Sequence, residues 1–175
     1  GILNFEESIS YIEELEVKSV TAPYINLGII YLNNKRNFKR SKELFNTVLK
    51  NASSVNNKND LIFGNYWLGI YNLQLLEHEK AVKYLNESYK LSTDLGFERL
   101  KSNSLAYLIA CHQYLNNKPL AKRYLEKSFE MKPIFARNLY QWAGWQLMLQ
   151  GNHQLSKTAF LEQLKIAKKN SNEND

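Results

Sequence analysis

Apolar side chains recur along the chain at intervals of three and four residues, with polar side chains between them. This is the spacing of one face of an α-helix, and seven glycines and three prolines leave few of the breaks that separate short strands. The pattern therefore predicts an all-helical protein. The expected helices cover residues 4–16, 21–34, 38–51, 60–75, 78–93, 98–115, 118–131, 135–150 and 153–169.

A small residue followed four positions later by a bulky apolar one recurs five times along the chain. The small residues lie 33, 40, 40 and 35 positions apart, a period typical of helical repeats. Since residues four apart share one side of a helix, each pair marks one packed helix face. The pairs are Ser8 and Ile12, Ser41 and Phe45, Ala81 and Leu85, Ala121 and Leu125, and Ser156 and Phe160.

A second element precedes the last four of these small residues. Its second residue stands 13, 12, 12 and 12 positions upstream of the small residue. Glycine or a small side chain there would let a neighbouring helix approach closely, and the bulky residue would fill the space between the two helices. The four copies are Leu27-Gly28, Leu68-Gly69, Leu108-Ile109 and Ala143-Gly144.

These residues resemble the tetratricopeptide repeat (TPR) family, in which two antiparallel helices form a unit of about 34 residues. The third unit matches the family spacing at Leu105, Leu108, Ala121, Leu125 and Pro133, and the first and fourth units add Tyr24-Leu27-Gly28-Tyr31 and Tyr140 with Gly144. The chain departs from the family at Asn72, His112 and Leu147, which stand where Tyr31 carries the usual aromatic, and at Ile109, which replaces the usual glycine. The resemblance implies a right-handed α-solenoid of antiparallel helix pairs with about nine helices.

The register divides a single TPR-like domain, residues 1–175, into four units and a leading half-unit. Two spacings of 40 residues indicate longer helices or loops, with the extra residues expected between Asn51 and Asp60 and in the turn from Thr93 to Gly96. The divisions are 1–17 for the leading helix, 21–53, 60–94 and 98–133 for the first three repeats, 135–169 for the fourth repeat and cap, and 170–175 for a polar tail.

The leading helix reads as the second member of a pair. Its partner would then lie upstream of Gly1, so we expect the chain to be the C-terminal TPR region of a larger protein, such as a bacterial regulatory or signalling protein. The alternative is a short protein whose first helix caps the array by itself. The lysine-rich last helix is expected to form a solvated end cap.

In the family, first helices line a concave face, and the resemblance implies that this face would bind a peptide. The side chains placed on it are Phe63, Tyr66, Ile70, Asn103, Gln113, Asn138, Gln141 and Trp145, with Ala22, Ile25, Ile29, Leu73, Ala106, Ala110 and Met148 beside them. About half of the apolar members are expected to pack between units, because an apolar stripe at helical spacing is usually core. The more exposed set is expected to be Tyr66, Gln113, Asn138, Gln141 and Trp145.

The predicted function is a protein- or peptide-binding scaffold for protein-protein interaction. Aromatic side chains would pack against those of a ligand, and Asn and Gln amides would pair with its backbone. Two alternatives are a nucleic-acid-binding helical repeat and a self-association module that forms a homodimer. The first needs basic residues at regular places on one face, whereas the expected groove is almost uncharged.

The charges and reactive side chains do not indicate catalysis. The 23 basic residues are interleaved with 17 acidic ones, which gives a net charge of +6 without a long basic block. Cys111 is the one cysteine, so the chain can form neither an internal disulfide nor a thiolate cage. Adjacent residues on a helix point in different directions, which disfavours a dyad of Cys111 and His112. His78 and His153 stand at equivalent turn positions of two repeats.

No phosphate-binding loop, zinc-protease sequence or nucleophile elbow occurs in the chain. We therefore expect a protein that is not an enzyme and that uses no cofactor or metal. No apolar run reaches the roughly 20 residues of a membrane span. The expected location is cytoplasmic, with the periplasm left open.

Overall fold

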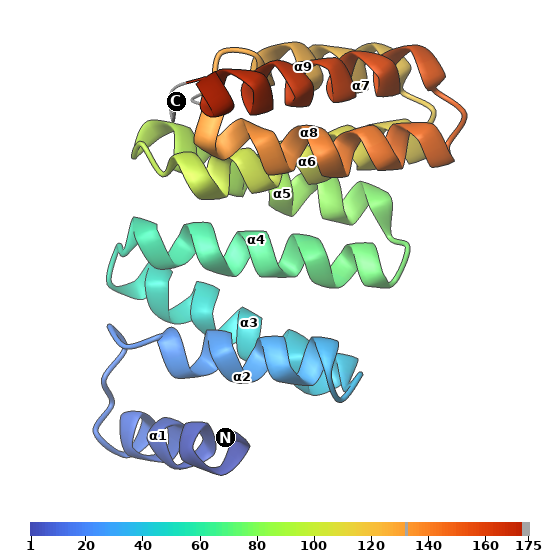
Figure 1. Cartoon of the computed structure of the whole chain (residues 1–175). Coiled ribbons are helices and arrows are strands. Elements are labelled where there is room, and N and C mark those ends of the chain that lie inside the picture. The colour runs from blue at the N-terminus through green and yellow to red at the C-terminus, as the bar shows by residue number, and fades with distance from the viewer. Residues whose placement is uncertain (132, 173–175) are drawn as a thin grey trace. The chain divides into compact units, whose positions relative to one another are not determined.

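The structure is a computed structural model that describes the backbone of residues 1–131 and 133–172. Side chains are described for the same residues except 133, 134, 137, 138 and 170–172. Within this part of the chain the secondary structure is entirely helical (Figure 1). The helices are α1 (Ile2–Glu14), α2 (Ala22–Asn33), α3 (Phe38–Ser54), α4 (Lys58–Gln74), α5 (His78–Asp94), α6 (Glu98–Tyr114), α7 (Lys118–Ser128), α8 (Pro133–Leu149) and α9 (His153–Asn172).

The helix bounds show whether the 40-residue spacings come from longer helices or from longer loops. Helices α3, α4, α5 and α6 each contain 17 residues, and short turns connect them. The polar stretch after Asn51 is mostly helix, because α3 continues to Ser54 and α4 begins at Lys58. The 40-residue spacings therefore come from longer helices and not from longer loops.

The chain forms two compact units. The first, Gly1–Leu91, holds α1 to α4 and most of α5, and the second begins at Ser92 and holds α6 to α9. In the first unit α1 packs on α2, α2 on α3, and α3 on α4. In the second unit α6 packs on α7 and on α8, and α8 packs on α9.

Seven of the interhelical turns in the described part of the chain share one construction. A residue in the left-handed region follows the helix, and the amide of the next residue donates to a carbonyl in the last helical turn, as in a Schellman cap. In the turn after α6, Asn116 has φ +54° and the Asn117 amide donates to the His112 carbonyl over 2.7 Å. Other left-handed turn residues are Glu16, Arg36, Asn56, Leu76, Gly96 and Gly151.

Asparagine then starts several of the following helices. Asn37 Oδ1 accepts a hydrogen bond from the Arg40 amide over 3.1 Å, and Asn57 does the same for the Asp60 amide over 3.2 Å. Asn117 and Asn152 occupy the same place before α7 and α9. These side chains satisfy amides that have no partner inside the helix, so part of the asparagine content is explained by N-capping.

The predicted contacts between glycine and a bulky side chain occur in both units. A Cβ added at Gly28 would lie 2.5 Å from Phe45 Cε1, and one at Gly69 would lie 2.6 Å from Leu85 Cγ. In the second unit a Cβ at Gly144 would lie 2.8 Å from Phe160 Cε1. The glycines therefore allow the close helix approach that the repeat spacing predicts.

Candidate binding faces

The candidate side chains of the first unit lie on α4 and are less accessible than expected. Phe63 is half-buried, whereas Tyr66 and Ile70 are each only 8% exposed. The expected exposure of Tyr66 is therefore wrong. Helix α4 carries buried residues in an almost continuous run from Ile62 to Asn72, which is typical of a helix covered on several sides.

Gln113, in the second unit, is also less accessible than expected. Its side chain is only 7% exposed, and Gln113 Oε1 accepts a hydrogen bond from Asn152 Nδ2 over 3.2 Å. That bond joins the end of α6 to the turn before α9. Gln113 therefore has a structural partner, and its expected exposure is wrong.

Three of the predicted side chains remain accessible in the second unit. Asn103 on α6 is half-buried, Gln141 on α8 is exposed, and Trp145 on α8 is 51% exposed. The Trp145 ring meets Phe160 edge to face, with centroids 6.0 Å apart. Asn138, three residues before Gln141, also belongs to α8, but its side chain is outside the described residues.

Two aromatic side chains that the sequence analysis did not select complete this surface. Tyr107 and Trp142 are half-buried, and their rings cross at 62° with centroids 4.5 Å apart. The spacing of Asn103 and Tyr107, four residues along α6, places both on one side of that helix. We call the resulting surface the α6–α8 face; it comprises Asn103, Tyr107, Gln141, Trp142 and Trp145.

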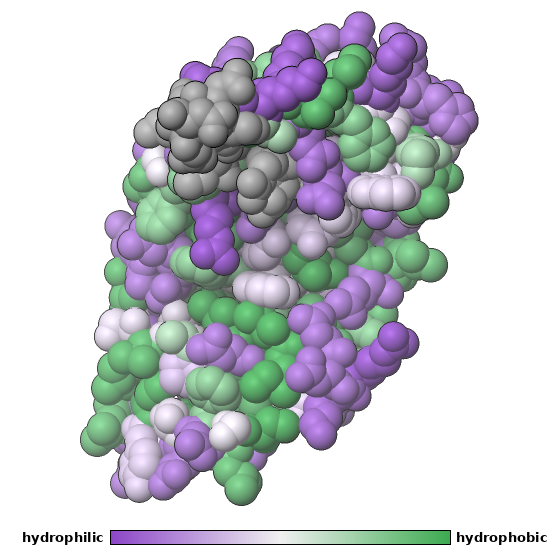
Figure 2. Space-filling view, viewed as in Figure 1, coloured by the Kyte–Doolittle hydropathy of each residue, from purple (hydrophilic) through white to green (hydrophobic). Residues whose placement is uncertain are grey.

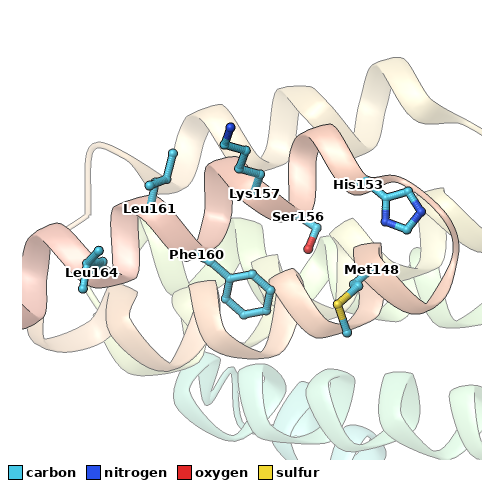
Figure 3. A pocket seen from close by; sticks show the side chains of 7 residues that line it. All are labelled: Met148, His153, Ser156, Lys157, Phe160, Leu161 and Leu164. Carbon is cyan, nitrogen blue, oxygen red and sulfur yellow. The ribbon is translucent and has the colours of Figure 1, made fainter.

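A second accessible surface lies at α9. A groove of about 410 Å³ runs between the end of α8 and α9 (Figure 3) and is lined by Met148, His153, Ser156, Lys157, Phe160, Leu161 and Leu164. An adjoining hollow of about 290 Å³ continues along α9 to Lys168. Leu161 and Leu164 are 47% and 48% exposed, so the exposed surface of α9 includes apolar side chains as well as lysines.

The lysines of α9 make this groove difficult to predict from the sequence. Lys157 lines the groove four residues before Leu161, and Lys168 lines the adjoining hollow four residues after Leu164. A hydrophobic pair at helical spacing inside a basic helix was the available signal.

The residues closest to catalytic chemistry are buried among apolar neighbours. Burial raises the pKa of the Cys111 thiol to about 12, so it stays protonated and unreactive at neutral pH. Burial lowers the pKa of His112, whose ring stacks on Tyr124 with centroids 5.4 Å apart. Neither His112 ring nitrogen has a hydrogen-bond partner among the described residues.

The described part of the chain contains neither a cluster of metal-ligating side chains nor a membrane-spanning helix. No group of three or more His, Cys, Asp or Glu side chains in this part could hold a metal ion. No helix in it is long and apolar enough to cross a lipid bilayer.

Antiparallel helix pairs with glycine-mediated contacts define an all-α, TPR-like fold, and the predicted fold class is confirmed. The structure is similar to the crystal structure of MamA, with a TM-score of 0.65 over 98% of this chain and 89% of that chain. The two sequences are 17% identical, so the likeness concerns the fold. No protein-family model and no curated protein matches the chain.

Proposed function

We propose that the chain is a protein-binding scaffold and that the α6–α8 face binds an extended segment of a partner protein. The observation that carries the proposal is the accessible aromatic surface formed by Tyr107, Trp142 and Trp145. Exposed aromatic side chains at the centre of a surface commonly supply most of the binding energy of protein interfaces. Helical repeats use such surfaces to hold partners.

The amides on the same face suit a peptide backbone. Asn103 and Gln141 each offer a carbonyl oxygen and an NH₂ group, which can accept from and donate to a main chain. The five side chains of the face carry no charge, so binding should depend weakly on salt. This absence of cations supports a protein partner over nucleic acid, whose binding is strongly salt-dependent.

The role in a regulatory or signalling protein that the sequence predicts would depend on the same binding face. A bound segment would connect the chain to the larger protein or assembly that it serves, and we assign it no catalytic step. That the larger protein is a bacterial regulatory or signalling protein stays a prediction.

Peptide display against the purified chain tests the proposal. We expect selected peptides to bind with dissociation constants near 1 μM, about −8 kcal/mol. Trp145→Ala and Tyr107→Ala should each weaken binding at least about tenfold, with unchanged helicity by circular dichroism. Val55→Ala, which truncates an exposed apolar side chain in the first unit, is the control.

The result has two readings. If both aromatic variants stay within about twofold of the parent chain, the α6–α8 face is not the binding site. Peptides that compete with one another and lose affinity in both variants, but not in Val55→Ala, would support it.

A further inference from the structure

The α9 surface and helix α1 carry opposite charges on faces that are otherwise apolar. Helix α1 contains Glu6, Glu7, Glu13 and Glu14 and no basic residue, and Glu16 follows it. Among the nine helices that the structure describes, it is the one with acidic and no basic side chains, in a chain of net charge +6. Helix α9 carries Lys157, Lys165, Lys168 and Lys169 against Glu162.

One side of α1 packs against the other helices of the first unit. Ile9 is buried in a cluster with Tyr24, Leu27, Leu44 and Val48. Two carboxylates support this packing, since Tyr31 donates to Glu6 over 2.9 Å and Tyr24 donates to Glu13 over 3.4 Å. Glu6 and Glu13 therefore hold α1 on α2.

The other side of α1 presents an exposed stripe. Leu3, Glu7, Tyr11 and Glu14 follow one another at intervals of four, four and three residues, which places them on one side of the helix. All four side chains are exposed, and Leu15 is exposed just after the helix. Figure 2 shows apolar beside polar residues over the part of the first unit where Figure 1 places α1 and α2.

The stripe on α9 has the matching composition. Lys157, Leu161, Leu164 and Lys168 follow at intervals of four, three and four residues, again on one side of a helix. Figure 3 shows the first three of these side chains on α9. Lys165 is paired with Glu162 inside α9, whereas Lys157 lines the groove and Lys168 lines the adjoining hollow.

We propose that the α9 groove binds helix α1 of a second copy of this chain. With Glu7 opposite Lys157 and Glu14 opposite Lys168, Tyr11 of one copy would pack on Leu161 and Leu164 of the other. Leu3 would then lie past Lys157, toward the end of the groove that Met148 and His153 line. Along a helix, Glu7 and Glu14 are separated by about 10 Å, and Lys157 and Lys168 by about 16 Å. The difference of about 3 Å at each end lies within the reach of flexible lysine side chains.

The geometry also sets the kind of assembly. A contact between two different surfaces of the same chain is heterologous, so it propagates head to tail into open oligomers or closes into a ring. Helix α1 is about 20 Å long, and one helix laid in one groove buries less than the roughly 1,200 Å² of a standard stable interface. The association is therefore weak and concentration-dependent.

Sedimentation velocity of the 175-residue chain from 10 μM to 1 mM tests the proposal. We expect the weight-average mass to rise above 20.5 kDa as concentration increases, and to return toward it in 0.5 M salt. Glu7→Lys/Glu14→Lys and Lys157→Glu/Lys168→Glu should each weaken self-association at least about tenfold. Lys83→Glu/Lys90→Glu, which reverses two exposed cations of α5, is the matched control and should associate like the parent.

Mixing the two charge-reversed variants supplies the decisive measurement. The reversed α1 of one variant then faces the reversed α9 of the other, so the mixture should associate again although each variant alone does not. A chain that stays monomeric at 1 mM, or a mixture that shows no recovery, would overturn the proposal. Binding of an unrelated acidic helix by a chain that remains monomeric would also overturn it, in favour of a different partner.

The proposal stands apart from peptide binding at the α6–α8 face. None of the charge-reversed residues belongs to that face, so selected peptides should bind these variants as they bind the parent. A parent chain that stays monomeric but shows Trp145-dependent peptide binding would show that only the self-association proposal had failed, and a parent chain that self-associates without such binding would show the reverse.

Discussion

At the scale of single residues, the turns explain much of the polar composition. A left-handed residue ends a helix, and an asparagine two or fewer positions later caps the next one, as at Asn56 and Asn57 or at Asn116 and Asn117. Asparagine tolerates the left-handed region better than most residues and is a favoured N-cap. The same residue type therefore serves both halves of the turn.

Leu76 is a poor residue for its turn. Its φ is +60°, where a side chain with a Cβ is strained, and its side chain is 75% exposed and so contributes little packing. Leu76→Gly should stabilise the fold by about 1 kcal/mol and raise Tm by about 2–4 °C. Thermal unfolding followed by circular dichroism measures the change.

Gly96 supplies the matched control for this prediction. It has φ +71° in the turn after α5, and a Cβ added there would meet nothing within 4 Å. Gly96→Ala should therefore lower Tm by a similar amount through backbone strain alone. A decrease for Leu76→Gly would mean that the leucine side chain contributes more than its exposure indicates.

His112 makes the stability of the second unit depend on pH. Burial lowers its pKa below the ordinary 6.5, so the unfolded chain binds a proton more readily than the folded one near that pH. Stability is therefore complete above about pH 6.5 and is lost as pH falls through that value toward the lower folded pKa. Urea unfolding at pH 7.5 and pH 5.5 should show this loss.

His112→Phe is the variant that separates this effect from other titrations. It keeps an aromatic ring against Tyr124 and removes two buried nitrogens that have no partner among the described residues. We expect it to be more stable than the parent by about 1–3 kcal/mol, with a smaller loss between the two pH values. An unchanged pH dependence would show that His112 is not its source.

At the scale of elements, each glycine contact is a local test of the repeat. At Gly28 an added methyl group would lie 2.5 Å from the ring of fully buried Phe45. Alanine gains about 1 kcal/mol in helix propensity, but overpacking a core costs about 1–3 kcal/mol. Gly28→Ala should therefore lower the free energy of unfolding, whereas Ser10→Ala on the exposed side of α1 should not.

A double variant checks the stated cause. If the clash with Phe45 is responsible, Gly28→Ala combined with Phe45→Leu should lose less stability than the two single changes add up to. Additive losses would show that Gly28→Ala acts through the backbone.

The helices were predictable because their signals are local. The glycines of the second element and the bulky residues of the small-bulky pairs stand at fixed spacings in the sequence, and they meet in the packing, as Gly28 meets Phe45 and Gly144 meets Phe160. Exposure was harder, since it depends on how many neighbours cover a helix: Tyr66 and Trp145 both stand on first helices, yet only Trp145 is exposed. The α9 groove was not predicted from the sequence because exposed Leu161 and Leu164 are interleaved with lysines.

At the scale of the whole molecule, stability should vary along the chain. Helices with few buried residues open to solvent more readily than helices with many. Helix α1 buries one residue, Ile9, whereas α4 buries nine. At 10 μM we expect amides of α1 to exchange with solvent at least about tenfold faster than those of α4, as measured by hydrogen-deuterium exchange mass spectrometry. Equal protection would mean that the first unit opens only as a whole.

Hydrogen-deuterium exchange at higher protein concentration also tests the proposed self-association. If α1 docks in the α9 groove of a second copy, association stabilises the docked state by mass action, so exchange in both α1 and α9 should slow between 10 μM and 1 mM. Helix α2, which packs on α1 within one copy, should change less. Protection that rises in α1 but not in α9 would indicate a contact between two α1 helices instead. In Lys157→Glu/Lys168→Glu the concentration dependence should disappear from α1, although that helix carries neither substitution.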